Sequence, residues 1–384
     1  MTKTLYTMTS TSAVQIVPVE TKKQLRKFIN FSIDLYKDNP YYVPELAMDT
    51  KSSLTTNPAL RFCQCQPFLA YKDGKVAGRV VALINPRANE AWKTKDVRFS
   101  WIDFIEDYDV CKALLDTVVA WGKERGMEHL EGPIGFIDYD REGCLVEGYD
   151  KMSTMSLAYS YPYYAQFFDR YGLVKNADWV EYRITIPEET DRFTRMAEVV
   201  TKRYGLRLNI FKNNRELRDK GAKDIFKLFN TCYAKLYGWS QLDDAQVQKL
   251  IDDYIPFVDV NMLPTIYDKD NNLVGCAIMI PSLAKAIQKA RGRLFPFGWW
   301  HLVKALKLKY DDTIEFLLVG VSPDYRGKGL NALMVSSVFP YVKKKGFKYC
   351  ETNANLESNN SIQALWKSFD HELVKRRRAY IKDI

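Results

Sequence analysis

The sequence predicts a mixed α/β protein built from two similar units, each a twisted, mostly antiparallel sheet flanked by helices. Three observations support this prediction. The 384 residues are 47% hydrophobic and 27% charged, a composition typical of a folded protein of two or three domains. Segments with strand-like and helix-like periodicity alternate along the chain. The order of these segments in the first half is repeated in the second half, and each half contains a hairpin.

The first unit is expected over residues 1–190. Short apolar runs indicate its strands, and apolar residues at helical spacing indicate its helices. Its hairpin turns at Asp73-Gly74, a strong turn signal. In chain order we expect strand 14–19, helix 22–36, hairpin 67–84, strand 97–105, helix 111–125, a strand near Leu130, helix 163–171 and strand 179–186.

The second unit is expected over residues 191–384, with the boundary within 187–195. Its hairpin turns at Asp270-Asn271-Asn272. In chain order we expect strand 206–211, helices 222–236 and 244–254, hairpin 263–280, strand 313–321, helix 330–345, strand 347–353, helix 360–369 and strand 373–382.

Charge and residue counts narrow the function classes. The formal charge of +9 favours anionic partners such as phosphates, coenzyme A or acidic lipid. None of the three histidines stands at a metal-ligand spacing to a cysteine or another histidine, so we expect no metal. The seven scattered cysteines, of which Cys63 and Cys65 are the nearest pair, indicate a reducing cytoplasm. No secretory signal and no run of about 20 apolar residues is present, so we expect a protein that is soluble or lies on a membrane surface.

The segment 321–330, VSPDYRGKGL, carries the sharpest chemical signal. It leaves an apolar strand and enters a helix, where backbone N–H groups and the helix dipole can bind an anion. Gly327 and Gly329 allow close approach of the backbone, and Arg326 and Lys328 add positive charge. A phosphate-binding loop is therefore one interpretation; a solvated turn that contains two glycines is the other.

The context of this loop resembles the GNAT acyltransferase superfamily. The acyl-CoA-binding motif of that superfamily is Arg/Gln-x-x-Gly-x-Gly/Ala, matched here by Arg326 and Gly329, with Asn331 as a departure in the last position. Residues 355–369 resemble the next motif of the superfamily, and the resemblance extends from Leu206 to the C-terminus. It implies acyl-CoA or acetyl-CoA as a substrate that is bound without a metal.

The resemblance also implies which residues hold the coenzyme. Backbone groups of the strand before the loop would pair with pantetheine, and the two asparagines would lie near the coenzyme, although an asparagine at a helix start is equally explained as an N-cap. The implied binding residues are Leu318, Val319, Val321, Arg326, Gly327, Lys328, Gly329, Leu330, Asn331, Asn355 and Asn359.

In this superfamily the amine of an acceptor attacks the thioester directly, and a base removes the proton of the amine. Free amines have a pKa near ~10, so the base is needed at neutral pH. Glu315 is the candidate catalytic base, although it could simply end a strand. Trp366 occupies the place where related enzymes carry a tyrosine that protonates the thiolate. Tyr325 and Tyr380 are weak substitutes, so the general acid is not identified.

The first unit resembles the same fold without its coenzyme loop. The corresponding segment 106–110, EDYDV, has three acids and no glycine, and it would repel a pyrophosphate. We interpret the first unit as a degenerate copy that shapes the acceptor site. An independent second active site is the alternative.

An insertion at 282–310 has seven Lys or Arg residues and no acid. Trp299, Leu302, Val303 and Leu306 fall on one helical face, so residues 294–309 are expected to make a peripheral contact with the inner face of the membrane. The alternative is that this helix packs on the core of the protein.

Motifs of the first half resemble a bacterial tandem GNAT family that includes ceramide-synthase-type N-acyltransferases. These motifs are NPYYVPE (39–45), FLA (68–70) with DG (73–74) and VAGR (76–79), GP (132–133), GCLVEG (143–148) and YPYY (161–164). The resemblance implies a sphingoid or other lipid amine as acceptor. A small-molecule or peptide N-acetyltransferase, an aminoacyl-tRNA-dependent enzyme and a non-catalytic lipid-binding module are alternatives, and a nucleic-acid partner is not expected.

Overall fold

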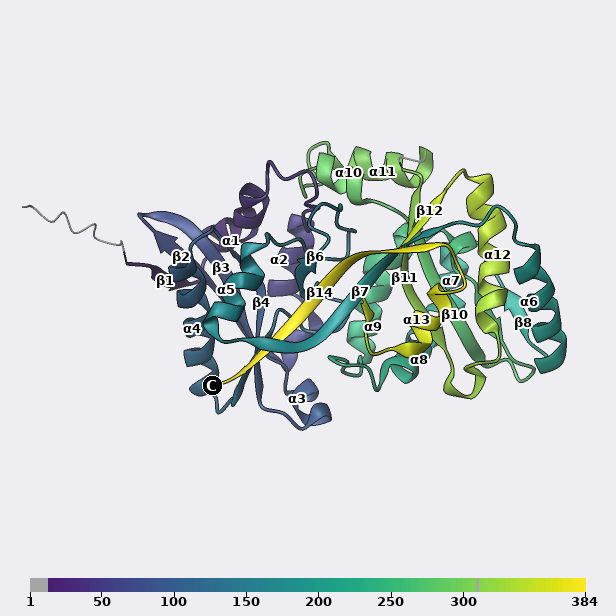
Figure 1. Cartoon of the computed structure of the whole chain (residues 1–384), viewed down its shortest axis with the longest axis horizontal. Helices are drawn as coiled ribbons and strands as arrows, with labels where there is room; N and C mark the ends of the chain where they lie inside the picture. Colours follow the sequence, from purple (N-terminus) through teal and green to yellow (C-terminus); the bar gives the residue numbers. More distant parts are fainter. Residues whose placement is uncertain (1–12, 309–310) are drawn as a thin grey trace, which may run out of the picture.

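The structure is a computed structural model that describes residues 13–308 and 311–384. Within these residues, fourteen strands form one continuous sheet (Figure 1). They are β1 (Gln15–Pro18), β2 (Gln64–Lys72), β3 (Lys75–Ile84), β4 (Asp96–Phe104), β5 (His129–Gly132), β6 (Cys144–Glu147), β7 (Val174–Thr185), β8 (Arg207–Asn209), β9 (Thr265–Tyr267), β10 (Leu273–Pro281), β11 (Thr313–Val321), β12 (Tyr349–Thr352), β13 (Asn355–Leu356) and β14 (His371–Asp383).

The two halves exchange their last strands. The order across the sheet is β1-β2-β3-β4-β5-β14-β7-β12-β11-β10-β9-β8, with β13 paired to β7 and β6 paired to β14. Strand β7 of the first half thus pairs with β12 of the second, and β14 from the C-terminus pairs with β5 of the first. Only β4–β5 and β11–β12 are parallel pairs among the described strands. Figure 1 shows β7 and β14 crossing the middle of the molecule side by side.

Helices cover both faces of this sheet. They are α1 (Lys22–Leu35), α2 (Ala47–Thr55), α3 (Pro86–Trp92), α4 (Tyr108–Lys123), α5 (Tyr163–Tyr171), α6 (Asp191–Tyr204), α7 (Asn214–Lys220), α8 (Ala222–Tyr233), α9 (Asp244–Tyr254), α10 (Ala284–Lys289), α11 (Gly298–Leu308), α12 (Leu330–Lys344) and α13 (Asn360–Trp366). Their starts follow local chemistry. Thr21 with Gln24, and Asp243 with Gln246, form capping boxes that satisfy the first N–H groups of α1 and α9.

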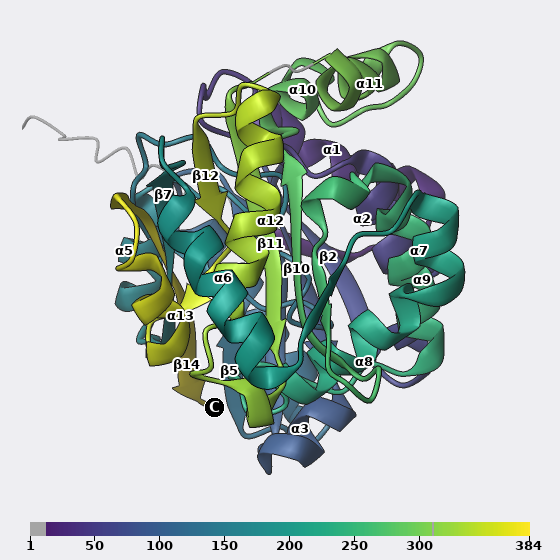
Figure 2. The same cartoon turned by 90° about the vertical axis from the view of Figure 1, so that its right-hand side faces the viewer.

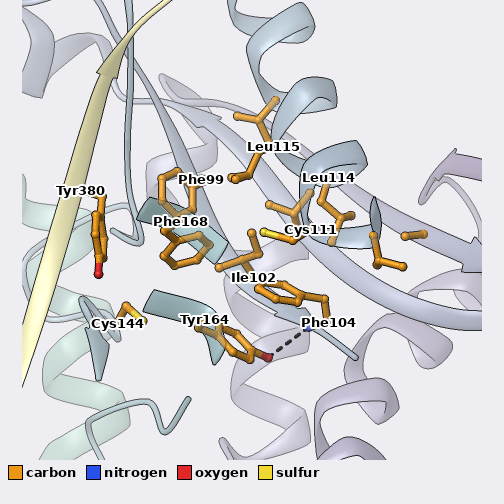
Figure 3. Close-up of a cluster of buried hydrophobic side chains, with 14 of the residues drawn as sticks. Phe99, Ile102, Phe104, Cys111, Leu114, Leu115, Cys144, Tyr164, Phe168 and Tyr380 are labelled. Carbon is orange, nitrogen blue, oxygen red and sulfur yellow. Dashed lines mark hydrogen bonds between the residues drawn. The ribbon is translucent and has the colours of Figure 1, made fainter. Parts of the chain in front are cut away.

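Three large apolar cores hold the layers together. The first lies between the first-half strands and helices α4 and α5. Tyr380 of β14 belongs to it and packs edge-on against Phe168 (Figure 3). The second core joins the halves, because Phe28 and Val81 of the first half share it with Phe229 and Leu250 of the second. The third lies under α6, α12 and α13, on the sheet face opposite α7–α9 (Figure 2).

The predicted fold class is confirmed, and most predicted elements are present. Helices 163–171 and 244–254 and strand 313–321 have the predicted bounds. The hairpin turn is also as predicted, since Asp73 and Gly74 have φ values of 51° and 73°. The sequence prediction missed helices α2, α3, α6, α7 and α10 and strands β6 and β13. The division at residue 190 stays a prediction, and residues 1–12 lie outside the described part.

Candidate active site

The glycine-containing loop connects β11 to the N-terminus of α12. Residues 323–325 form one short 3-10 turn, and Gly327 and Gly329 follow with φ values of 74° and 82°, which favour glycine. Helix α12 begins directly after Gly329, so its first N–H groups face this loop. The Arg326 guanidinium donates to the carbonyl of Cys232 at 3.1 Å and remains exposed. The loop therefore has the shape and charge of an anion-binding site.

Strands β11 and β12 separate just beyond their start. They pair from Thr313–Tyr349 to Phe316–Thr352, but β11 continues to Val321 without β12. The chain after β12 instead turns to β13, which pairs with β7. Leu317 is an extra residue opposite β10, since Phe316 pairs with Met279 and Leu318 with Ile278. Strands β11 and β12 therefore diverge next to the Leu317 bulge. Backbone groups at this bulge do not take part in the hydrogen-bond ladder between β10 and β11.

A cavity of about 750 Å³ fills this opening and extends to the loop. Ten of the eleven predicted coenzyme-binding residues line it, and Lys328 is the exception, because its ammonium lies over the rings of Tyr204 and Tyr325. The ten are Leu318, Val319, Val321, Arg326, Gly327, Gly329, Leu330, Asn331, Asn355 and Asn359. The fold thus brings together residues that are up to 41 positions apart, from Leu318 to Asn359.

The backbone of Val319 is already engaged at the edge of this cavity. The hydroxyl of Tyr233 on α8 donates to the Val319 carbonyl at 2.9 Å and accepts from the Val319 N–H at 3.3 Å. These are backbone groups that the resemblance assigns to pantetheine. A pantetheine that pairs with Val319 must therefore displace this hydroxyl.

The two predicted asparagines have structural partners. Asn359 is the N-cap of α13 and accepts from the N–H of Ile362 at 3.4 Å, so the capping interpretation is correct. Asn355 accepts from the indole N–H of Trp366 at 3.2 Å. Trp366 lines the cavity, whereas Tyr380 is buried in the first-half core and does not. Tyr325 also lines the cavity, with its hydroxyl 3.4 Å from Asp268.

Glu315 lies one residue before Phe316 but is not part of the cavity wall. Its side chain is 2% exposed; it accepts from the hydroxyl of Ser282 at 2.8 Å and from the N–H of Met155 at 3.3 Å. Burial raises the pKa of Glu315 to about 7, and the nearby Glu351 carboxylate acts in the same direction against the Ser282 hydrogen bond. Ser156, the neighbour of Met155, does line the cavity.

The sequence interpretation missed a group of acids that the first half adds to the cavity wall. Asp138, Asp140 and Glu142 lie in the loop between β5 and β6 and line the cavity together with Tyr139. The predicted acidic segment 106–110 is elsewhere: Asp107 caps α4 and pairs with Lys72. The only sequence signal for the missed group was the alternation of acids in IDYDREG (137–143), a pattern that matches no standard motif.

The insertion forms α10, a connection and α11 on one edge of the molecule (Figures 1 and 2). Leu302 and Ala305 are buried against α10 and Val43, but Trp299 and Val303 are exposed. The four residues predicted to share one helical face therefore differ in exposure: Leu302 and Leu306 pack on the protein, whereas Trp299 and Val303 are exposed. The membrane contact stays a prediction. Within the insertion, four aromatic side chains are exposed: Phe295, Phe297, Trp299 and Trp300, with exposed fractions of 80%, 78%, 45% and 53%. Lys309 lies outside the described residues.

Two kinds of feature are absent from the described residues. No group of three or more His, Cys, Asp or Glu side chains is placed to hold a metal ion. No described helix has the length and apolar character required to cross a bilayer.

Comparisons with known proteins agree with this geometry. Residues 222–370 match the sequence profile of the Acetyltransferase (GNAT) family. Protein YghO of Escherichia coli (strain K12) is 26% identical over 372 residues, 94% of each chain. A protein named bacterial ceramide synthase, from Caulobacter vibrioides (strain NA1000 / CB15N), is 24% identical over 383 residues, 97% of this chain and 98% of that protein. A solved tandem GNAT protein from the clavulanic acid biosynthesis pathway shares the fold, with a TM-score of 0.54 at 13% identity over 96% of this chain and 98% of that one.

Proposed function

We propose that this chain, an acyltransferase with a GNAT domain over residues 222–370, transfers a long-chain acyl group from coenzyme A to the amine of a lipid. The observation that carries the proposal is the single cavity of about 750 Å³ that joins the Arg326–Gly329 loop to the opened strands. Its volume lies within the range of about 300–1,000 Å³ that is typical of small-molecule and cofactor sites. If the phosphates of coenzyme A bind at the loop, its pantetheine would lie along β11 and its thioester near the Leu317 bulge.

Apolar side chains around the cavity support a long acyl chain. Phe193 and Met196 of α6 line it together with Val335 and Phe369, and the rings of Phe193 and Phe369 stack with their centroids 5.2 Å apart. Met196 is more than half exposed, so an alkyl chain there would cover apolar surface that now faces water. The relative named bacterial ceramide synthase matches over nearly the whole chain and supports a lipid acceptor.

The exposed aromatic side chains of the insertion support contact with a membrane surface. Phe295, Phe297 and Trp300 project from a segment that carries Lys and Arg but no acid. Aromatic rings at headgroup level and cations near lipid phosphates are the features of an interfacial anchor. A peripheral position would let the enzyme take a lipid amine from the bilayer.

Glu315 is the proposed general base of this reaction. A carboxylate with a pKa of about 7 is half ionised near neutrality, which suits proton transfer from an amine. It accepts from the N–H of Met155, and the next residue, Ser156, lines the cavity, which supports a base close to the cavity wall. The protonated amine first gives one proton to the base; the neutral nitrogen then forms the new bond to the acyl carbon, the carbon–sulfur bond breaks, and the departing CoA thiolate takes up the second proton of the nitrogen.

Calorimetry with CoA, acetyl-CoA and palmitoyl-CoA, the last below its micelle concentration, tests the proposal. We expect all three to bind, palmitoyl-CoA most tightly, and Arg326→Ala to weaken all three by a similar factor. Arg215→Ala is the matched control, because that side chain is 92% exposed on α7. Equal binding of the three ligands would indicate a short-chain acetyltransferase. Absence of binding would reject the coenzyme site itself.

A further inference from the structure

The cavity has a second wall of opposite charge. The Arg326 loop lies at one part of the cavity, and Asp138, Asp140 and Glu142 of the first half lie at another. None of these three carboxylates forms a salt bridge with any residue in the described part of the chain. Two arginines whose charges act on Glu142 also lie near other carboxylates: Arg98 is 3.8 Å from Glu131, and Arg377 is 2.6 Å from Glu181. Nε of Arg98 and one terminal nitrogen of Arg377 have no hydrogen-bond partner among the described residues.

The three acids have different tasks. Asp140 holds the shape of its own loop, since its Oδ2 accepts from the N–H groups of Phe136 at 2.7 Å and Ile137 at 3.1 Å. Glu142 is 5% exposed, and its Oε2 has no hydrogen-bond partner among the described residues. Asp138 lines the cavity beside it without a hydrogen bond to another described side chain. A buried carboxylate oxygen without a partner is costly and indicates that something else binds there.

The loop that carries these acids is held rigidly by the first half. Arg98 on β4 donates to the carbonyl of Gly135 at 3.0 Å, and Asn85 donates to the carbonyl of Phe136 at 2.8 Å. Gly135 packs so closely on Asp140 that a Cβ there would lie 2.3 Å from that side chain. Side chains on such a support keep their positions in the absence of ligand, as a binding site requires.

We propose that Asp138 and Glu142 form the acceptor subsite, which binds the acceptor as an ammonium ion next to the thioester. The inference rests on the proposed acyl transfer and adds that the first half selects cationic acceptors. A primary amine with a pKa near ~10 enters the cavity as a cation, and a buried cation needs an anionic partner. An alcohol of the same chain length is uncharged and cannot form an ion pair with these two carboxylates, so amines are preferred as acceptors.

Steady-state kinetics tests the subsite, with dodecylamine as acceptor, palmitoyl-CoA as donor and release of free CoA thiol as readout. We expect Asp138→Asn and Glu142→Gln each to raise the KM for dodecylamine by at least about 30-fold, the lower end of the effect of removing one member of a buried charge pair. The affinity for palmitoyl-CoA should stay within about twofold. Asp138→Glu should recover part of the loss, and Asp38→Asn, on an exposed segment, is the matched control.

Direct titration of dodecylamine against dodecanol, followed by the fluorescence of the protein, tests the subsite without turnover. The wild type should bind the amine at least about tenfold more tightly than the alcohol, and both variants should lose this preference. Equal binding of amine and alcohol by the wild type would overturn the subsite, as would a drop in kcat at unchanged KM in both variants. Failure of acyl-CoA to bind at all would instead reject the proposed function.

Discussion

Arg377 donates from Nε to Oε1 of Glu181 at 2.6 Å, and both side chains are almost completely buried. Glu181 lies on β7 and Arg377 on β14, so this ion pair joins the two strands that the halves exchange. Lys375 of β14 adds a second cation, 3.0 Å from the other oxygen of Glu181. Although burial raises the pKa of Glu181, the two cations outweigh it and hold that pKa below its usual value.

Glu181→Gln should destabilise the whole molecule by about 3–5 kcal/mol, because it leaves the buried Arg377 without its carboxylate and Lys375 with only Glu351, 3.6 Å away. Urea unfolding followed by far-UV circular dichroism measures this loss. Since β7 and β14 belong to both halves, we expect one cooperative transition at lower urea. Asp219→Asn on α7, whose pair with Arg215 is exposed, should change stability by less than about 0.5 kcal/mol. Loss of only one half in Glu181→Gln would contradict a shared fold.

The regular elements could be predicted from the sequence because their cause is local. Apolar spacing in 244–254 and the Asp73-Gly74 turn depend on neighbouring residues only. The strand exchange could not be predicted, because the sequence of a strand such as 371–383 does not indicate which strands it pairs with. Short helices such as α10 were missed because six residues give too few turns to show a period.

The candidate site likewise has parts that the sequence could predict and parts that it could not. The Arg326–Gly329 loop was found because strand, glycines and helix are consecutive in sequence. Asp138 and Glu142 were missed because they lie in an irregular loop of the other half, almost 180 residues before Leu318, and only the tertiary fold brings them to the cavity. The division of α11 into a packed and an exposed side likewise depends on its neighbours, Val43 and α10.

Glu315→Gln should lower kcat by about 10²–10⁴-fold and leave acyl-CoA binding unchanged. The ionised carboxylate is the active base, so the wild-type kcat should rise as the pH increases through about 7 and then level off. The variant should lack this rise. Ser282→Ala removes a hydrogen bond that lowers the pKa of Glu315, so the midpoint of the rise should move to higher pH. A pH profile identical in wild type and Glu315→Gln would remove Glu315 from the mechanism.

Tyr233→Phe should strengthen acyl-CoA binding by about two- to tenfold. The hydroxyl occupies the N–H and carbonyl of Val319, and its removal spares pantetheine the displacement of a hydrogen bond worth about 0.5–1.5 kcal/mol. Calorimetry with CoA measures the change. Tyr71→Phe is the control, because Tyr71 is a part-buried tyrosine of the first half whose hydroxyl accepts from Lys27. Weaker CoA binding in Tyr233→Phe would mean that this hydroxyl contacts the coenzyme itself.

Asp138→Asn should make the protein more stable at pH 8 while it weakens acceptor binding. Burial raises the pKa of Asp138 to about 7, although Arg98 opposes this and Asp140 adds to it, and burial also raises the pKa of Glu142. The Arg377 guanidinium faces Glu142 from β14, and the Tyr233 hydroxyl lines the same cavity from α8. A carboxyl group whose pKa is raised on folding contributes stability at low pH, and this contribution is lost as the pH rises through about 7.

Thermal unfolding of wild type and Asp138→Asn at pH 5 and pH 8 measures this difference. The advantage of the variant should be on the order of 1 kcal/mol, or about 2 °C, at pH 8 and smaller at pH 5, where the unfolded aspartate, with a pKa of about 3.9, is already ionised but the buried carboxyl is not. A variant that is less stable at both values would show that the Asp138 carboxylate already has a partner in the folded protein.

Replacement of Trp299 and Trp300 by alanine should weaken binding to vesicles and leave CoA binding unchanged. Both indoles are about half exposed, whereas Leu302 and Ala305 hold α11 on the protein, so the fold should survive the change. Phe295→Ala with Phe297→Ala should act in the same direction, because these rings are still more exposed. Val174→Ala with Val199→Ala is the control, since these exposed side chains lie on β7 and α6, away from the insertion.

Co-sedimentation with vesicles of phosphatidylglycerol and phosphatidylcholine measures this binding. The wild type should bind best to vesicles rich in phosphatidylglycerol, and salt should weaken it, because the cations of 282–308 meet the lipid phosphates. The aromatic variants should keep the salt dependence but lose affinity, since they remove only the apolar contribution. If the wild type does not sediment with either vesicle, the exposed aromatic side chains serve another partner and the lipid amine must reach the cavity from solution.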